Sequence, residues 1–453
     1  MAGDPVTGDI PGHWEFTTLG EVCRRGGGNI QTGPFGSQLH ASDYVPVGVP
    51  SIMPTNIGEN RIVENGIVRI TENDANRLGQ HRLKVGDIIY SRRGDVEKRA
   101  LIREREDGWF CGTGCLKVRL GSGVVDPLFA SLFLGHPSVK EWIVRHAVGA
   151  TMANLNTAIM SAVPFALPPL REQKSIASVL GTLDDLIEVN REINETLEEM
   201  ARALFKSWFV DFDPVRAKLE GRPPAGMDTA TAALFPDHFQ DSDLGQIPKG
   251  WEAIPLYDTA KYINGAAFKS DDFSGPGVGL PVIKIGELKQ GITDQTKWSE
   301  REAGDNQIIH TGDLVYSWSG SPDTSLEAFL WSHGRGLLNQ HIFKVVAPTI
   351  AQKHFVYYLL QYLRPVLVET AKNKQTTGLG HVTVADMKRI LVCWPGKDVL
   401  ASFDRMIGPI FDSAFENTLE SQNLATLRDT LLPKLLSGEL SVSAAKEFIT
   451  AST

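Results

Sequence analysis

Residues 171–209 read REQKSIASVLGTLDDLIEVNREINETLEEMARALFKSWF, a stretch with no proline and a single glycine, Gly181. Apolar or small residues recur there in alternating steps of four and three, at Ile176, Leu180, Leu183, Ile187, Asn190, Asn194, Leu197, Ala201, Leu204 and Trp208. This spacing is typical of the a/d seam of a coiled coil. We therefore predict a continuous helix of about 34 residues, roughly 50 Å long at 1.5 Å per residue.

The same spacing returns near the other end of the chain, at Phe403, Ile407, Ile410, Ala414, Asn417, Ser421, Leu424, Leu431 and Leu435. Arg428 is the one charged interruption. Asn190 in the first seam corresponds to Asn417 in the second, and a buried asparagine fixes the register of a coiled coil at a cost in stability. We predict that the two helices pair as an antiparallel coiled coil. Two separate amphipathic helices would explain the periodicity but not the two matched seams.

The segments before each helix also occur twice. DIPGHWEFTTL (9–19) resembles QIPKGWEAIPL (246–256), and LKVGDIIYSRRG (83–94) resembles IHTGDLVYSWSG (309–320). ATMANLNTAIMSAVPFALPP (150–169) aligns with GLGHVTVADMKRILVCWPG (378–396), with Met160 and Met387 in register. Because the segments keep their order, they indicate an internal duplication of roughly 230 residues, far longer than a solenoid unit of about 20–50 residues.

The duplication defines the predicted fold class and domains. Each copy has short β-branched and aromatic runs between turn residues and then a helical stretch, which predicts an α+β fold of two similar β-rich domains. These domains are separated by the two paired helices, with an approximate two-fold relation. The predicted boundaries are a first domain at 1–170, a central helical region at 171–211, a linker at 212–245, a second domain at 246–396, and a distal helical region with the C-terminal tail at 397–453.

Composition indicates a cytoplasmic protein. The chain has no run of eighteen apolar residues, its N-terminus lacks the features of a secretory signal, and four cysteines in 453 residues do not suggest a disulfide framework. The formal net charge is −9, but residues 12–160 carry 17 Lys and Arg against 15 Asp and Glu, and residues 249–395 carry 15 against 14. The two copies are thus slightly basic, which permits DNA binding by local faces.

Sequence motifs for catalysis are missing. The chain has no G-x-x-x-x-G-K-[ST] phosphate loop and no H-E-x-x-H metal motif, and GGGNIQTGPFG (26–36) lacks the spacing of a dinucleotide fingerprint. Cys111 and Cys115 form a plausible metal-ligand pair, but no second pair of ligands matches it. We therefore predict no catalytic residue, no metal site and no cofactor in this chain.

Several of these segments together resemble a known family. Two domains opened by IP-x-x-WE, the phrase LPPLREQ leading into a long helix, and LFKSWFVDFDPVRAK followed by LGQIPKGW are similar to the specificity (S) subunit of type I restriction-modification systems. The resemblance covers nearly the whole chain. One departure is WPGKDVLASF in the second copy, where the first copy has PPLREQKSIA.

The resemblance implies a non-catalytic DNA-recognition subunit. Each domain would recognise one half of a bipartite double-stranded target, and the helices would set the gap between the halves; roughly 50 Å corresponds to about 15 base pairs. The expected partners are modification subunits, two per complex, which use S-adenosylmethionine to methylate adenine N6. Restriction subunits, which use ATP and Mg²⁺, are further expected partners. The target adenine would be flipped into a modification subunit.

Base recognition requires Arg or Lys for guanine and phosphate, and Asn or Gln for adenine, on loops that follow strands. In the first domain the candidates are Gln31, Phe35, Ser37, Gln38, Arg92, Arg93, Lys98 and Arg99. In the second domain they are Lys269, Ser317, Trp318, Ser319, Asn373, Lys374 and Gln375. Because Arg92 and Arg93 are cationic where the second copy has Trp318, we predict a guanine in the first half-site near this loop.

Two other function classes fit parts of the sequence. A tandem adaptor held apart by a coiled coil, binding protein or glycan, would explain the duplication, and loss of DNA binding upon Arg92→Ala with Arg93→Ala would argue against it. An enzyme with an atypical site, such as a nuclease or a methyltransferase, would transfer methyl groups or cleave DNA as the purified chain alone.

Overall fold

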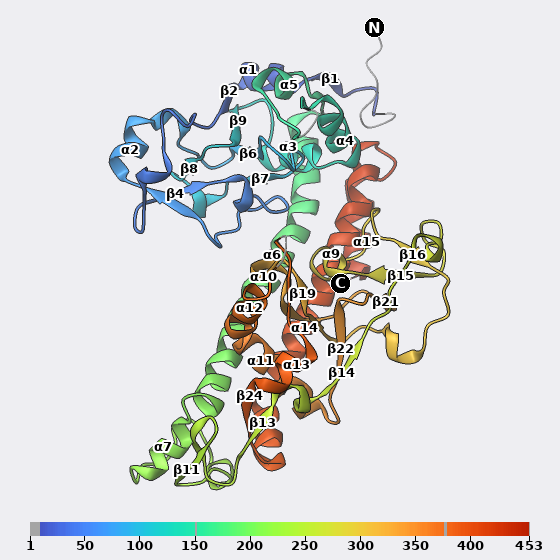
Figure 1. Ribbon diagram of the computed structural model, residues 1–453. Coiled ribbons are helices and arrows are strands. Elements are labelled where there is room, and N and C mark those ends of the chain that lie inside the picture. The colour runs from blue at the N-terminus through green and yellow to red at the C-terminus, as the bar shows by residue number, and fades with distance from the viewer. Residues whose placement is uncertain (1–9, 150–151, 376–377, 453) are drawn as a thin grey trace. The chain divides into compact units, whose positions relative to one another are not determined.

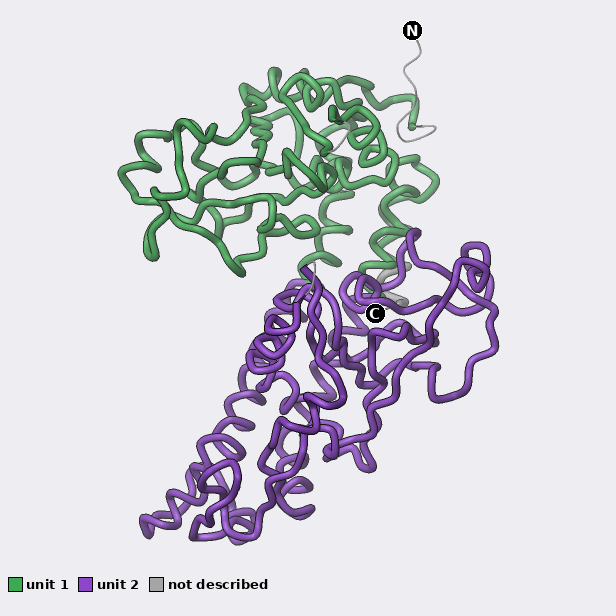
Figure 2. The backbone as a smooth tube through the Cα atoms, in the orientation of Figure 1, with its two compact units in different colours: residues 1–187, 423–453 green, residues 188–422 purple. Residues whose placement is uncertain are grey.

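A computed structural model describes residues 10–149, 152–375 and 378–452. The chain forms two compact units, coloured separately in Figure 2: unit 1 contains residues 1–187 and 423–453, and unit 2 contains residues 188–422. Two long helices, α6 (Leu170–Phe209) and α14 (Lys397–Leu436), each contribute residues to both units. They are the green and the red helices of greatest length in Figure 1.

Unit 1 is a mixed α/β structure. Its strands are β1 (Glu15–Thr18), β2 (Gly27–Thr32), β3 (Tyr44–Val45), β4 (Val49–Ile52), β5 (Val68–Ile70), β6 (Ile88–Ser91), β7 (Arg99–Leu101), β8 (Phe110–Cys111), β9 (Cys115–Gly121) and β10 (Pro164–Leu167). Its shorter helices are α1 (Leu19–Gly26), α2 (Glu72–Arg77), α3 (Pro127–Leu134), α4 (Pro137–His146), α5 (Thr157–Ala162) and α15 (Val442–Ser452). One four-stranded sheet has the order β2-β9-β6-β7, a second has the order β3-β5-β4-β8, and β1 pairs with β10.

Unit 2 repeats this plan with additions. Its strands are β11 (Phe239–Ser242), β12 (Gly245–Pro248), β13 (Glu252–Pro255), β14 (Lys261–Asn264), β15 (Leu280–Ile283), β16 (Trp298–Ser299), β17 (Ile308–Ile309), β18 (Leu314–Ser317), β19 (Ser319–Gly320), β20 (Glu327–Leu330), β21 (Gly336–Leu338), β22 (Ile342–Val346), β23 (Gly380–His381) and β24 (Leu391–Trp394). Its shorter helices are α7 (Asp213–Leu219), α8 (Thr229–Ala233), α9 (Ile285–Gln290), α10 (Pro322–Ser325), α11 (Ile350–Tyr362), α12 (Arg364–Lys372) and α13 (Val384–Arg389).

The predicted duplication is confirmed by the strand order. Unit 2 has a sheet of order β14-β22-β18-β20, a second sheet of order β16-β15-β21-β17, and a pair β13-β24, and each of these three has a counterpart in unit 1. Each second sheet also contains one parallel pair, β4 with β8 in unit 1 and β15 with β21 in unit 2. The α+β fold of two similar β-rich domains and two long helices is therefore observed.

The repeated opening segment has a packing role. Trp14 and Trp251 are 8% and 4% exposed, and each lies directly before the strand that pairs with the last strand of its copy. The indole Nε1 of Trp14 donates a hydrogen bond to Glu172 Oε2 over 3.0 Å. The next residue, Gln173, is fully buried and accepts a hydrogen bond from the backbone N–H of Asp126 over 2.8 Å. LPPLREQ thus fixes the beginning of α6 to the first domain.

The two long helices pair in antiparallel orientation within each unit. In unit 1, Asp184 of α6 contacts Arg428 of α14. In unit 2, Asn190 donates to Glu420, while Asn194 Nδ2 donates to the Ala414 carbonyl, both over 2.9 Å. As the residue numbers increase along α6, the numbers of the contacting residues on α14 decrease. The predicted seam positions are all buried or half-buried: Leu180, Leu183, Ile187, Asn190, Leu197, Leu204, Ile407, Ile410, Asn417, Leu424 and Leu431.

The asparagines that correspond in the repeat do not contact each other on the seam. Asn417 Nδ2 donates to Asn194 Oδ1 over 2.9 Å, so its partner is Asn194 and not Asn190. Repeat alignment compares equivalent positions of two copies, whereas an antiparallel pair brings non-equivalent positions together. A side-chain amide pair on the seam satisfies both groups and resists a shift of one helix along the other.

Residues 212–245, whose composition predicts a linker, form ordered structure in unit 2. They contain α7, α8 and β11, which pairs with β12. Phe235 is 1% exposed, and its ring centroid lies 5.0 Å from that of Trp208. Asp228 caps α8, and the apolar residues Val215, Ala217 and Phe235 of this segment are buried.

Candidate nucleic-acid interface

The repeated phrase Gly-Asp-apolar-apolar-Tyr-Ser forms a turn and a strand in both units. Gly86 and Gly312 have φ of +87° and +90°, a conformation that glycine adopts without steric cost. The following aspartates close the turn: Asp87 accepts from Lys84 N over 2.9 Å, and Asp313 accepts from His310 N over 2.8 Å. Strands β6 and β18 then run through the middle of their sheets. In both copies the segment therefore ends at the same position, the end of an inner strand of a four-stranded sheet.

The residues after these strands share one backbone frame. The carbonyl of Arg92 accepts from Leu155 N, and the carbonyl of Trp318 accepts from Val382 N, both over 2.9 Å. The next residue in each copy forms an antiparallel bridge, Arg93 with Asn154 in unit 1 and Ser319 with His381 in unit 2. We call these two places the unit 1 edge (Arg92, Arg93 and Asn154) and the unit 2 edge (Trp318, Ser319 and His381). Their backbones correspond and their side chains differ.

The unit 1 edge brings two of the predicted loops together. The Arg92 guanidinium lies 5.7 Å from the centroid of the Phe35 ring, a cation–π contact, and Arg92 Nε donates to the Leu155 carbonyl over 3.2 Å. Phe35 is 56% exposed, and its backbone N–H donates to Gln38 Oε1. An exposed aromatic ring beside a fixed guanidinium is suited to contacts with bases and phosphates.

The other candidates of unit 1 lie in different environments. Arg93 and Ser37 are exposed, Gln31 is half-buried on β2, and Lys98 forms an exposed ion pair with Asp95. Arg99 is 6% exposed, and its Nε donates to the Ser131 carbonyl over 2.6 Å. We therefore assign Arg99 to the interior of unit 1. It lies on β7, where strand alternation turns its side chain inward, away from the side that carries Lys98.

The unit 2 edge is built around Trp318. Its ring packs on Phe343 at 5.6 Å between centroids and on His341 at 5.7 Å, and its Nε1 donates to Asn264 Oδ1 over 3.1 Å. Asn264 and His341 are exposed. Ser317, in contrast, is fully buried at the end of β18 and its hydroxyl has no partner among the described residues, so it does not reach the surface.

The remaining candidates of unit 2 are engaged to different degrees. Lys374 Nζ lies 2.5 and 2.7 Å from the two carboxylate oxygens of Asp386. Burial alone would raise the pKa of Asp386, but hydrogen bonds from Lys374 and Thr383 outweigh it and lower the pKa to about 2. Gln375 Nε2 donates to the Gly378 carbonyl, and Asn373 and Lys269 are exposed. The charge of Lys374 is therefore neutralised inside unit 2.

Two edge residues, Asn154 and His381, and two residues that contact Trp318, Asn264 and His341, were not among the sequence candidates. The alignment that places Met160 opposite Met387 also places Asn154 opposite His381, so the sequence contained this signal. Asn154 Oδ1 is buried without a hydrogen-bond partner among the described residues, which leaves an acceptor for a ligand. Asn264 and His341 were missed because they come from other strands and reach Trp318 only through the fold.

The described part of the chain contains no cluster of three or more His, Cys, Asp or Glu residues arranged to hold a metal ion. Within the same residues, none of the helices has the length and apolar character needed to cross a membrane.

Comparison with known proteins gives a consistent family. The sequence model described as type I restriction modification DNA specificity domain matches residues 11–199 and 248–428. The type I restriction enzyme HindI specificity subunit of Haemophilus influenzae is 26% identical over 406 residues, 79% of this chain and 87% of that protein. The MjaIX specificity subunit of Methanocaldococcus jannaschii is 24% identical over 442 residues, 96% of this chain and 95% of that protein. The crystal structure of a type I S subunit from M. genitalium has a TM-score of 0.52 at 16% identity and covers 95% of this chain and 97% of that one, which supports the fold.

Proposed function

The chain belongs to the type I restriction-modification specificity family, and we propose that it is the DNA-recognition subunit of such a complex, with each unit recognising one half of a bipartite target. Specificity subunits are the non-catalytic members of these systems, so methyl transfer and cleavage would belong to other chains. The complex would act in the cytoplasm.

The observation that carries this proposal is the pair of edges with one backbone frame and different side chains. A protein that recognises two different half-sites needs the same scaffold twice, with different donors and acceptors at the contact positions. Arg92 and Arg93 offer guanidinium donors that suit guanine O6 and N7, and Trp318, Ser319 and His381 offer a different set. We therefore expect a guanine in the half-site that unit 1 recognises.

The exposed face of α6 in unit 2 is the proposed docking surface for modification subunits. Val189, Ile193 and Met200 are 49%, 43% and 53% exposed, although they are apolar and spaced by four and seven residues on one helix face. Such a stripe is typical of a helix that packs against another helix. Two modification subunits are expected, carrying S-adenosylmethionine, and restriction subunits with ATP and Mg²⁺ could join the same complex.

The test is a map of N6-methyladenine in an unmethylated host that expresses this chain with its modification subunit. The expected motif has two short specified halves around a fixed unspecified gap. Arg93→Ala should relax one half only and His381→Ala the other only, each by about 1–3 kcal/mol of base discrimination. Lys84→Ala is the matched control, because Lys84 is exposed at the opposite end of β6.

Three outcomes would contradict the proposal. An unchanged motif in both edge variants would show that other loops recognise the bases. A continuous motif would exclude the bipartite arrangement. Absence of methylation by an assembled complex, together with salt-independent binding to protein or glycan, would favour the tandem adaptor.

A further inference from the structure

An exposed apolar side chain lies next to each of the two edges. Met152 is two residues before Asn154 of the unit 1 edge and is 59% exposed. Leu379 is two residues before His381 of the unit 2 edge and is 58% exposed. Each also lies five residues before the first residue of the helix that follows, α5 in unit 1 and α13 in unit 2. The two side chains therefore occupy equivalent positions of the repeat.

The backbone that carries the two side chains is fixed in the same way in both units. The N–H of Gly94 donates to the carbonyl of Ala153 over 3.1 Å, and Gly320 pairs with Gly380. Ala153 and Gly380 directly follow the two apolar residues. Because two residues of extended chain span at most about 7 Å, each apolar residue begins close to its edge, within roughly two base-pair steps.

The similarity of Met152 and Leu379 contrasts with the edge residues beside them. The cationic Arg93 of unit 1 corresponds to Ser319 of unit 2, so the donors differ between the units. Residues that distinguish two half-sites must differ, whereas a residue with the same role at both half-sites can be of one kind. A single exposed apolar residue needs no explanation. The same exposure at the same position of both copies indicates a shared role.

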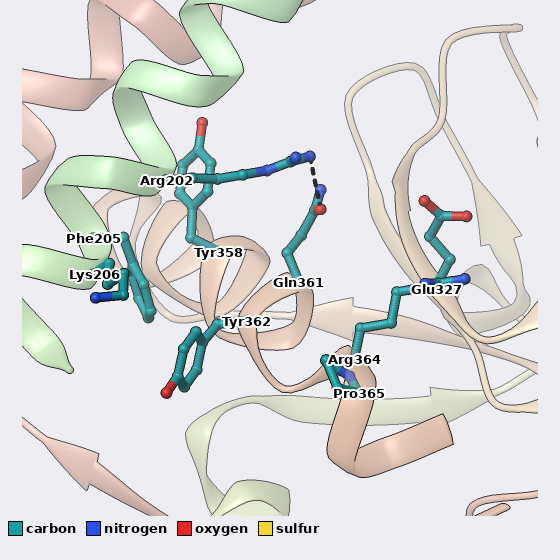
Figure 3. A pocket seen from close by; sticks show the side chains of 9 residues that line it. All are labelled: Arg202, Phe205, Lys206, Glu327, Tyr358, Gln361, Tyr362, Arg364 and Pro365. Atoms are coloured by element: carbon teal, nitrogen blue, oxygen red, sulfur yellow. Dashed lines mark hydrogen bonds between the residues drawn. The ribbon is translucent and has the colours of Figure 1, made fainter. Parts of the chain in front are cut away.

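Other exposed apolar side chains of unit 2 are not repeated. Tyr362 is 46% exposed and lies in a pocket of about 390 Å³ lined by α6, α11 and α12 (Figure 3). Tyr362 comes three residues before Pro365 of α12, whereas Leu134, three residues before Pro137 of α4, is fully buried. Exposure at this position is therefore a property of unit 2 and not of the repeat.

We propose that Met152 and Leu379 are apolar wedges, which insert against the base stack beside each half-site and favour its local unstacking. This inference rests on the proposed function in DNA recognition. Methionine and leucine are among the side chains that proteins insert between base steps, and the insertion partly unstacks the bases. A base that is to be modified must leave the stack, so unstacking next to it assists the reaction at either half-site. The edge residues would set the sequence and the wedges would deform it.

The test uses the full chain assembled with its modification subunit and a duplex that carries the mapped motif. 2-Aminopurine, placed next to the target adenine of one half-site, becomes more fluorescent when its neighbours unstack. We expect such a rise with the wild type at both half-sites. Met152→Ala should lose roughly half of the rise or more at the half-site that Arg93→Ala relaxes, and Leu379→Ala at the other. The recognised motif should stay unchanged in both variants.

Matched variants separate the wedges from other exposed apolar residues. Val85 and Ile350 are 54% and 68% exposed. Val85 precedes β6, and Ile350 follows the end of β22 that pairs with the beginning of β18, so both lie away from the edges. Val85→Ala and Ile350→Ala should leave the fluorescence unchanged. Met152→Leu should keep the full rise, because leucine is the residue of unit 2 at this position.

A mismatched base pair next to the target adenine distinguishes a wedge from a base contact. Met152→Ala should bind the matched duplex about fivefold to tenfold more weakly than the wild type, because buried apolar contacts are lost. It should bind the mismatched duplex as tightly as the wild type does, because the mismatched bases are already partly unstacked.

Three results would overturn the proposal. A full rise in fluorescence with both alanine variants would show that the side chains do not deform the duplex. A loss of affinity that the mismatch does not restore would indicate a direct contact to a base, such as a thymine methyl group. Weaker assembly of the alanine variants with the modification subunit in the absence of DNA would make both positions protein contacts. Failure of the wild-type complex itself to bind the duplex would instead contradict the proposed function, and the wedges with it.

Discussion

The two units share their strand order, but α6 and α14 contact each other through different side chains in each unit. In unit 1, Arg428 of α14 forms a buried ion pair with Asp184 of α6 over 2.7 Å. In unit 2, Phe209 of α6 packs edge-on against Phe403 of α14 and Phe355 of α11, both at 4.9 Å between centroids. We call the first contact the ionic junction and the second the aromatic junction. The same backbone repeat is therefore compatible with either kind of contact between α6 and α14.

The aromatic junction should give the largest effect on stability. Trp208 is 2% exposed and contacts the rings of Phe235 and Phe403. Trp208→Ala should lower the free energy of unfolding of unit 2 by about 3–5 kcal/mol, because a large cavity would remain. Hydrogen exchange of unit 2 peptides and chemical denaturation measure this loss. Met200→Ala, at an exposed position of the same helix, should cost no more than about 0.5 kcal/mol. Similar losses in both variants would show that the cluster does not hold the junction.

The ionic junction should respond differently to single and double changes. Burial alone would lower the pKa of Arg428, but the neighbouring carboxylates, Asp184 foremost, outweigh it and raise the pKa. Arg428→Met should cost about 3 kcal/mol, because Asp184 would stay buried without its cation. Adding Asp184→Leu should recover most of that loss in denaturation experiments. Arg24→Met, which breaks an exposed pair with Glu21, should change stability by less than about 1 kcal/mol. A double variant no more stable than the single one would contradict this account.

The sequence predicted the helices and the duplication because both depend on regular spacing. The heptad positions of α6 and α14 and the two Gly-Asp turns follow from periodicity and from φ requirements that one residue type satisfies. Periodicity also identified Arg428 as an exception. It did not indicate Asp184 as the partner, because antiparallel pairing joins residues far apart in the chain. The short elements within residues 212–245 were not predicted for a related reason, since the buried Phe235 packs against Trp208, which lies outside this segment.

The unit 1 edge and the unit 2 edge could be predicted in part. The alignment of the two copies located Arg92 with Arg93, and Trp318 with Ser319, because the strands before them are similar. It did not indicate that Arg99 and Ser317 are buried, since side-chain direction depends on which face of each sheet is covered. Asn264 and His341 required the assembled sheet, because they reach Trp318 across neighbouring strands. Local pattern thus predicts where an edge begins, and tertiary structure decides which side chains complete it.

Acid should destabilise unit 1 through His81. This side chain is buried against Phe110, and burial, assisted by the charge of Lys117, lowers its pKa from an ordinary value near 6.5 to about 4. Because the folded pKa is lower, the unfolded chain binds the proton first, and stability is lost as pH falls from 6.5 towards 4. His81→Gln should reduce the difference in unfolding free energy between pH 7 and pH 4.5 by about 2 kcal/mol.

The counterpart in unit 2 sharpens this prediction. Burial also lowers the pKa of His354, but Asp404, 2.7 Å away, opposes the shift by hydrogen bonding and charge. We therefore expect His354→Gln to change the acid sensitivity of unit 2 by less than His81→Gln changes that of unit 1. His238→Gln, at an exposed position, is the control. Equal effects of the His81 and His238 variants on the pH dependence would exclude the buried imidazole as its source.

The smallest effects should come from the two repeated turns, and their near equality tests whether the units share a backbone frame. Gly86→Ala and Gly312→Ala each place a side chain at a φ near +90°, which should cost about 1 kcal/mol in denaturation experiments. Gly86→Ala should cost slightly more, because its Cβ would lie 3.1 Å from Pro127, whereas the Cβ of Gly312→Ala meets nothing closer than Phe415 at 4.0 Å. Gly36→Ala and Gly304→Ala are the controls, since neither position has positive φ or a close neighbour. If only one of the two variants lost stability, the Gly-Asp segment would not have the same conformational role in both units.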